Sequence, residues 1–286
     1  MQEFEAQTRA FAAQIERELE SGQLNFPTSM DVSLRIKKLA DDPESSIDDI
    51  VAVVRTEPVL SAKTIRMSNA MLLNPYGAHI TSVNNAVKRI GLAALRCLAF
   101  AVAAEQLTQD KRSKELQGIA SALWRHSVDI ASWSYAFAHH LRTVNPDAAM
   151  LAGMMVNIGQ FFLLSRMSAF PALEENLDRF AEFVSVWHEP IARSVLEVFE
   201  LPDDILDAFE YEDPYGGEWP PANLRDIVRL ATLAAEAVNP FDELLKVKPH
   251  PELLEDSLAG IGKDQFTGLL EAARAGKNAM LEAVAS

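Results

Sequence analysis

Residues 149–164 read AMLAGMMVNIGQFFLL, sixteen residues without a charge. Asn145 and Pro146 precede this stretch, and these residue types favour the N-cap and the first position of a helix. A helix that is apolar on nearly every side belongs in the middle of a bundle. The stretch therefore predicts a central buried helix around which the chain packs, with Val156 followed by the single polar residue Asn157 at its heart.

The flanking sequence predicts an all-α protein, because apolar residues recur at helical spacing and no segment keeps a period of two. Ser46 and Asp49 have the spacing of a capping box at the start of a helix, and Gly91 separates two apolar segments. We expect helices over residues 2–20, 32–39, 47–55, 58–72, 83–90, 92–107, 119–142, 172–186, 189–199, 203–211 and 223–238, and two more within 251–284.

These helices predict a multi-helix bundle with two helical lobes. The polar residues 108–118 are the best boundary between the lobes. The expected parts are an N-terminal amphipathic helix (1–22), an N-terminal lobe (23–107), a connector (108–118), a C-terminal lobe (119–245) and a C-terminal helical extension (246–286).

Charge and composition exclude several classes of protein. The single cysteine, Cys97, excludes an internal disulfide, and the amphipathic, acidic N-terminus does not resemble a signal peptide. The longest apolar runs are shorter than the ~20 residues that a membrane span needs. Residues 1–125 carry 15 Lys and Arg against 15 Asp and Glu, so the net charge of −15 falls on residues 126–286. An acidic lobe opposes nucleic-acid binding because it repels phosphates. From the cysteine count, the N-terminus and the short apolar runs we expect a soluble, cytoplasmic protein.

The more basic segment 50–115 leaves a small anionic ligand or an acidic partner possible. Four residues in or beside its predicted helices are candidate ligand or partner contacts: Lys63, Arg66, Asn69 and Arg89. The competing interpretation is that the three cations form a solvated face. Asn69 would then fasten the turn around Asn74.

Few residues could carry metal or acid-base chemistry. His126 falls on the long helix 119–142, Asn157 on the central helix, and His188 before Glu189 and Pro190. The sequence contains no H-E-x-x-H motif, no phosphate-binding glycine loop and no G-x-S-x-G elbow. Each of the three residues could equally serve packing, since a buried amide or imidazole must be hydrogen-bonded.

The order of several short motifs resembles the HDOD family, whose domains are distantly related to the HD-type phosphohydrolases. The resemblance spans about residues 24–241. Its landmarks are TEPVL (56–60), IRMSNA (65–70), IGL (90–92), LWRHS (123–127) and AGMMVNIG (152–159).

The resemblance implies where a catalytic relative would bind metal. Such enzymes use a His, a His-Asp pair and a later Asp, and these positions fall on His126, on Val156 with Asn157, and on Thr232. His188 resembles a further histidine of related domains. Valine has no donor atom, and Asn157 offers a neutral carbonyl where a divalent cation needs charge. We therefore expect a relic pocket with no catalytic residue, no metal ligand and no cofactor.

The resulting prediction is a non-catalytic bacterial signal-transduction module. It would act through protein contacts or a small ligand in the relic pocket. The partners would be unknown signalling proteins, and the family resemblance implies cyclic-di-nucleotide or two-component systems. The amphipathic first helix and the acidic back of the molecule are the expected contact areas. Two alternatives stay open. One is a divergent metal-dependent phosphohydrolase that uses His126, His188 and carboxylates such as Glu189 or Glu210. The other is a nucleotide receptor that uses segment 50–115.

Overall fold

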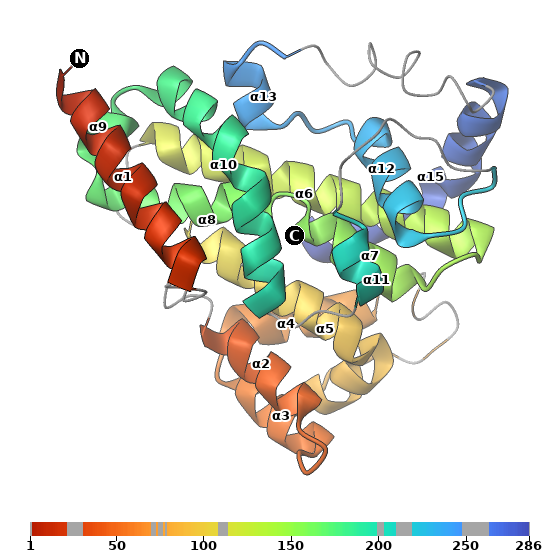
Figure 1. The fold of residues 1–286 in the computed structure, drawn as a ribbon. Coiled ribbons are helices and arrows are strands. Elements are labelled where there is room, and N and C mark those ends of the chain that lie inside the picture. The colour runs from red at the N-terminus through yellow and green to blue at the C-terminus, as the bar shows by residue number, and fades with distance from the viewer. Residues whose placement is uncertain are drawn as a thin grey trace.

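The structure is a computed structural model that describes residues 2–21, 31–69, 73, 77, 79–107, 114–198, 203–209, 219–247 and 263–285. All regular secondary structure within these ranges is helical, which confirms the predicted all-α class. The helices form two groups, a small one at the bottom of Figure 1 and a larger one above it.

The lower group consists of α2 (Asp31–Asp41), α3 (Ile47–Arg55), α4 (Pro58–Ser68) and α5 (Val83–Leu107), which pack against one another. The predicted capping box is present: the Ser46 side chain accepts from Asp49 N, and the Asp49 side chain accepts from Ser46 N. Gly91 has φ 77° and ψ 169° inside α5, so the helix is kinked where the sequence predicts a separation. Glycine adopts this positive φ without steric cost.

The upper group is built on α6 (Lys114–Leu141), a long helix that is buried along most of its length. Its main neighbours are α7 (Pro146–Met155), α12 (Leu224–Ala234) and α15 (Lys263–Ala285), and contacts between α5 and α7 join the two groups. Because α6 begins at Lys114, the last five residues of the predicted connector 108–118 are helical, and residues 108–113 lie outside the described ranges.

The predicted central helix is two helices, so this expectation is wrong in one respect. Asn145 caps α7 as predicted, accepting from Asp147 N at 2.8 Å and Ala148 N at 3.2 Å. The helix ends at Met155, and α8 (Ile158–Arg166) begins after Asn157, whose φ of −99° and ψ of 16° depart from helical values. The break leaves the Asn157 side chain directed into the bundle, where it is hydrogen-bonded.

Together α7 and α8 form the core of the fold. By length and composition, Pro146–Arg166 could cross a membrane, but 83% of its most apolar window is buried among the other helices. The core segment of a soluble protein has this property, so we assign the stretch to the interior of a soluble helical domain.

The remaining helices cover one side of this core. They are η2 (Met167–Ala169), α9 (Pro171–Glu174), α10 (Leu177–Val198), α11 (Asp203–Asp207) and α13 (Pro240–Leu244). The predicted break near Pro190 is wrong, because Pro190 lies inside α10. Its ring is exposed while the next two residues are buried, so packing holds the helix through the proline.

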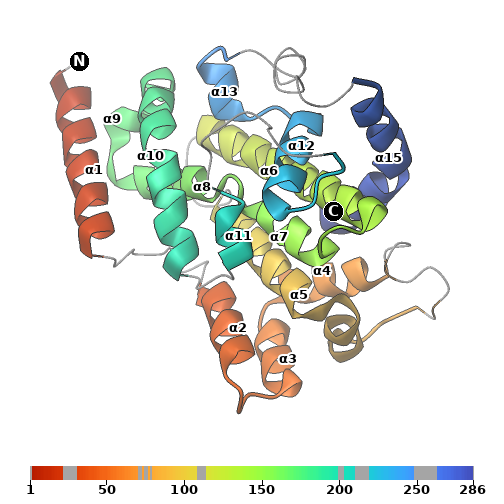
Figure 2. The ribbon, with the colours of Figure 1, turned by 45° about the vertical axis from the view of Figure 1, so that its right-hand side comes forward.

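The N-terminal helix α1 (Gln2–Ser21) packs against α9 and α10, apart from the lower group, as Figures 1 and 2 both show. Phe11 is fully buried, with its ring centroid 5.0 Å from that of Phe170 and 5.1 Å from that of Phe183. Glu18 forms an ion pair with Arg166. The apolar face that the sequence offered as a contact area is therefore already occupied within the chain.

Candidate functional site

Three elements meet around His126 and Asn157, where the family resemblance implies that an HD-type enzyme would bind metal: α6, the junction between α7 and α8, and the extended segment 235–239 after α12. We call this place the HD-type position. His126 of α6 is buried, and its Nδ1 lies 2.6 Å from the carbonyl oxygen of Ala237. A carbonyl oxygen only accepts, so Nδ1 must carry the hydrogen. The histidine thereby ties segment 235–239 to α6.

Asn157 is the centre of a buried hydrogen-bond network. Its Nδ2 donates to Ser127 Oγ at 2.8 Å, and its Oδ1 accepts from Asn239 Nδ2 at 3.4 Å. Asn239 Nδ2 also donates to Gln160 Oε1 at 3.0 Å, while its Oδ1 accepts from Phe241 N at 3.0 Å. All four side chains, those of Ser127, Asn157, Gln160 and Asn239, are buried. The HD-type position is thus filled by neutral groups that satisfy one another.

This donor set does not fit a divalent metal ion. Within the described ranges, no three His, Cys, Asp or Glu side chains converge in a way that could hold one. The Asn157 carbonyl already accepts a hydrogen bond, and Val156 ends α7 half-buried without a donor atom. Hard and borderline cations need charged or well-placed oxygen and nitrogen ligands, which this set lacks.

A carboxylate does lie close by, but it holds backbone. Asp129 follows His126 by three residues and therefore shares its face of α6. Its Oδ2 accepts from Glu236 N at 2.6 Å and from Ala237 N at 2.9 Å. Asp129 is not among the residues predicted from the sequence, although its spacing of three from His126 is a signal for it. His126 and Asp129 thus bind the C=O and the N–H groups, respectively, of segment 235–239.

The segment that they hold was predicted to be the end of a helix over 223–238. Instead α12 ends at Ala234, and Ala235 is extended with φ −60° and ψ 130°. Asn239 is also extended, as a residue before proline prefers, and it caps α13. The sequence signal was Asn239 with Pro240, which marks a helix start and not a helix continuation.

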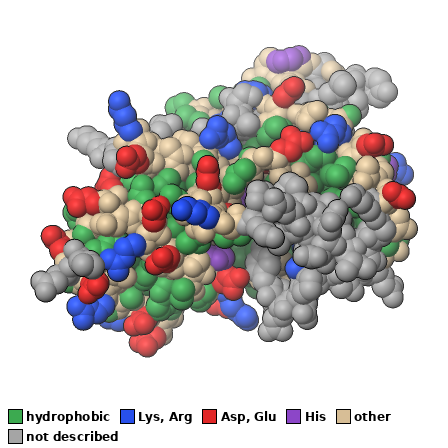
Figure 3. All heavy atoms as spheres, turned by 90° about the horizontal axis from the view of Figure 1, so that it is seen from above, with side chains coloured by type: hydrophobic (Ala, Val, Ile, Leu, Met, Phe, Trp, Pro, Cys, Tyr) green, Lys and Arg blue, Asp and Glu red, His purple; other side chains and the backbone are tan. Residues whose placement is uncertain are grey.

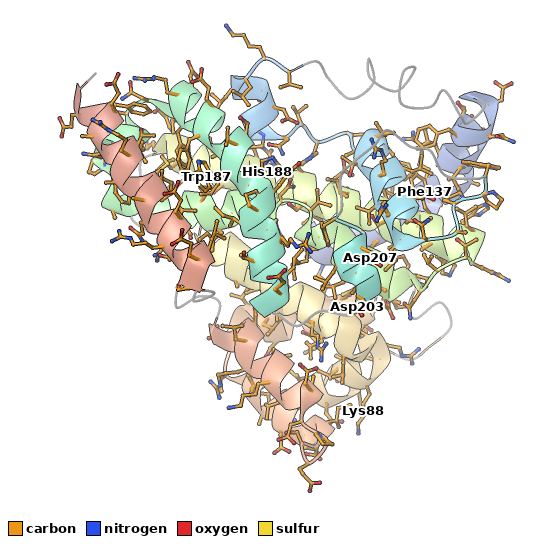
Figure 4. All side chains as sticks on the ribbon, viewed as in Figure 1. Lys88, Phe137, Trp187, His188, Asp203 and Asp207 are labelled. Atoms are coloured by element: carbon orange, nitrogen blue, oxygen red, sulfur yellow. The ribbon has the colours of Figure 1, made fainter. Side chains whose placement is uncertain are left out.

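The other two predicted pocket residues lie in different surroundings. His188 is half-buried on α10 (Figure 4) and interacts electrostatically with Asp242 of α13. Burial lowers the pKa of His188, while the carboxylates of Glu189 and Asp242 partly oppose that shift. Thr232 donates its hydroxyl to Val228 O at 2.9 Å within α12. Its role as the counterpart of a metal-binding Asp stays a prediction.

Among the predicted ligand contacts, Lys63 and Arg66 both reach across the fold. Lys63 is buried, with its Nζ 5.9 Å from the centre of the Trp124 ring on α6. The Arg66 guanidinium donates to the carbonyl oxygen of Glu282 in α15. Both cations thus link α4 to helices of the upper group, and a ligand role for either stays a prediction.

Asn69 and Arg89 both hydrogen-bond to described residues between α4 and α5. Asn69 Nδ2 donates to Ile80 O at 2.7 Å, and Asn69 Oδ1 accepts from Ile80 N at 2.8 Å. Arg89 Nη1 donates to Leu73 O at 3.3 Å. The turn around Asn74, to which the structural alternative assigned Asn69, lies outside the described residues, so that alternative stays a prediction.

Comparison with known proteins identifies the family. The model of the HDOD domain matches residues 26–214, about two thirds of the chain, so the chain belongs to the HDOD family. The match takes in α2 to α11 and leaves α1, α12, α13 and α15 outside it.

Solved structures share the fold. A candidate metal-dependent phosphohydrolase from Shewanella amazonensis SB2B has a TM-score of 0.63 and 22% identity, covering 95% of this chain and 99% of its own. An HDOD domain protein of unknown function from Geobacter sulfurreducens has a TM-score of 0.55 and 22% identity, covering 94% and 96%. A candidate signal transduction protein from Marinobacter aquaeolei VT8 has a TM-score of 0.52 and 18% identity, covering 98% and 66%.

A curated relative adds the context of a longer chain. An uncharacterized protein from Treponema pallidum (strain Nichols) is 22% identical over 228 residues, which is 73% of this chain and 41% of that protein. This chain therefore spans about two fifths of the length of the relative.

Proposed function

We propose that this chain is a regulatory HDOD module that does not hydrolyse phosphoesters at the HD-type position. The observation that carries the proposal is the buried network of Ser127, Asn157, Gln160 and Asn239. Polar groups of this network satisfy one another without a charge. A cation placed among them would have to break those bonds and would gain no carboxylate in return.

The charges around the position support the same conclusion. Asp129 lies on the same face of α6 as His126, and both its oxygens are engaged, one by backbone N–H groups and one by Lys277. Metal-assisted hydrolysis needs an ion that lowers the pKa of a bound water. A neutral donor set lacks the negative charge that would bind such an ion. The proposal therefore differs from the description of one protein of similar fold as a candidate metal-dependent phosphohydrolase.

A module of this kind would pass its signal on through protein contacts. One protein of similar fold is described as a candidate signal transduction protein, which supports a role beside signalling partners. The apolar face of α1 is buried, so contacts would use outward-facing side chains. On the face seen from above in Figure 3, acidic and basic side chains are interspersed over the described surface, so shape and local pattern would set specificity more than net charge.

The proposal is tested by metal analysis and turnover. The purified chain is loaded with manganese, iron or zinc and desalted, and bound metal and phosphodiester hydrolysis are then measured. The same measurements are made on His126→Ala and on a matched control, His140→Ala, whose side chain is exposed on the same helix. We expect no stoichiometric metal and no turnover in any of the three. Metal at one ion per chain, with turnover that His126→Ala abolishes and His140→Ala preserves, would refute the proposal.

A further inference from the structure

The C-terminal helix α15 packs across the back of α6 and reaches α4, so it touches both helix groups. It lies beyond the residues that match the HDOD domain. Its inward face is formed by buried side chains, Phe266, Leu269, Ala273, Lys277 and Met280. Four of these are apolar. The fifth is a lysine with a side chain only 4% exposed, and such a buried charge requires a partner.

The partner of Lys277 is Asp129, the carboxylate that holds segment 235–239. Lys277 Nζ lies 2.9 Å from Asp129 Oδ1, and the Asp129 side chain is 5% exposed. This contact is an ion pair without the alignment of a hydrogen bond. The other oxygen of Asp129 accepts the backbone N–H groups of Glu236 and Ala237. One buried carboxylate therefore joins α15 to the segment at the HD-type position.

Further contacts hold α15 to the same segment and to the lower helix group. Glu236 lies 3.5 Å from Lys277 Nζ and 3.2 Å from Arg274 Nη1. At the other end of α15, Arg66 of α4 donates to the Glu282 carbonyl oxygen. A cation at this end is also favoured by the helix dipole. The helix thus bridges α4, α6 and segment 235–239.

We propose that α15 is a regulatory clasp whose docking keeps segment 235–239 closed over the HD-type position. Polar contacts run from Lys277 through Asp129 to the backbone at 236 and 237, and two residues later Asn239 enters the Asn157 network. When α15 leaves, Asp129 loses its counter-ion and Glu236 loses both cations. The segment then loosens, and the side-chain amides of Asn157, Gln160 and Asn239 become accessible. Coupling of this kind is reciprocal, so opening the segment also weakens α15 docking.

This inference rests on the proposed function in treating the HD-type position as the regulated site. The coupling itself is independent of catalysis, because it is measured as backbone motion. A positive result in the metal and turnover assay would overturn the proposed function and leave the exchange measurement interpretable.

The test is residue-resolved amide hydrogen exchange on the full chain. Lys277→Met removes the charge and keeps an apolar stem, while Met280→Ala loosens α15 without touching Asp129. Arg193→Ala, which breaks the exposed Arg193–Glu197 pair on α10, is the matched control. In both α15 variants we expect exchange of the 236 and 237 amides and of α15 to rise together by about tenfold or more. Exchange in α2 and α3 should stay at its wild-type rate, and the control should change neither segment.

The reverse arm uses Asn239→Ala, which removes the anchor of the segment and should raise exchange in α15. Three results overturn the proposal. One is faster exchange in α15 with wild-type exchange at 236 and 237. The second is equal acceleration in α2 and α3, which indicates general unfolding. The third is wild-type exchange in both segments of every variant. If Lys277→Met does not fold, Met280→Ala and Asn239→Ala decide the question.

Discussion

Gly159→Ala is expected to destabilise the protein strongly, because α8 and α10 approach each other at this residue. A Cβ atom at Gly159 would lie 1.9 Å from the carbonyl oxygen of His188, 2.8 Å from its carbonyl carbon and 3.0 Å from Ala192 N. All three are backbone atoms of α10, so no side chain can rotate away. Ordinary contact begins near 3.4 Å, so the two helices must separate locally by about 1.5 Å.

The size of the effect follows from that separation. A gap of about 1 Å already forfeits roughly a quarter to a half of the dispersion energy of the atoms on either side. Overpacking of a tight core costs about 1–3 kcal/mol, and a clash with backbone belongs at the upper end. Replacing glycine in a helix returns about 1 kcal/mol. We therefore expect a net loss of about 2 kcal/mol or more in the free energy of unfolding.

The matched control is Gly268→Ala on α15, where an added Cβ meets nothing within 4 Å. This substitution gains helix propensity without a clash and should stabilise by up to about 1 kcal/mol. Urea unfolding followed by circular dichroism measures both variants. A clash at this helix contact is refuted if Gly159→Ala unfolds at the wild-type urea concentration or above it, or if the two alanine variants shift in the same direction by similar amounts.

Three further predictions concern the polar network, the turn after α4 and pH. Asn157→Ala removes a hydrogen-bond partner of Asn239 and should lower the free energy of unfolding, measured with urea, by about 1–3 kcal/mol. A change under about 0.5 kcal/mol, which is roughly the scatter of neutral substitutions, would contradict the network. Asn69→Ala removes both bonds to Ile80 and should also cost about 1–3 kcal/mol in the free energy of unfolding, with faster proteolysis between α4 and α5. Unchanged proteolysis would show that these bonds do not hold the segment. The folded pKa of His188 lies below its ordinary value of 6.5, so the unfolded chain binds the proton first. Stability should fall as the pH drops below about 6.5, and His188→Gln should flatten this part of the profile; an equally steep profile in the variant would show that other groups cause it.

The helical class and most helices of the lower group were readable from local sequence. Ser46 with Asp49 marked a helix start, Gly91 marked a kink, and Asn145 with Pro146 marked the entry to the core, and each has the predicted local conformation. These features depend on residues a few positions apart, whose propensities and capping bonds act over one turn. The order of the motifs added the HDOD resemblance, and the family match over residues 26–214 confirms the family.

The break at Asn157 and the early end of α12 required the tertiary structure. The uncharged apolar run 149–164 predicts one continuous helix, and the structure divides it at Asn157, whose side chain bonds to other elements. Ser127 and Asn239 receive the Asn157 side chain from 30 and 82 positions away along the chain. Sequence spacing does not report bonds of that range.

The sequence by itself therefore determined the helical class and the family, and the family resemblance predicts that Val156 and Asn157 stand where a catalytic relative has its metal-binding His-Asp pair. Only the folded chain decided what fills their place, because hydrogen-bond satisfaction in a buried site is settled among side chains that distant helices bring together. The same holds for Asp129 and Lys277. Each is an ordinary helical charge in the sequence, and packing of α15 on α6 removes both from water and makes them a pair.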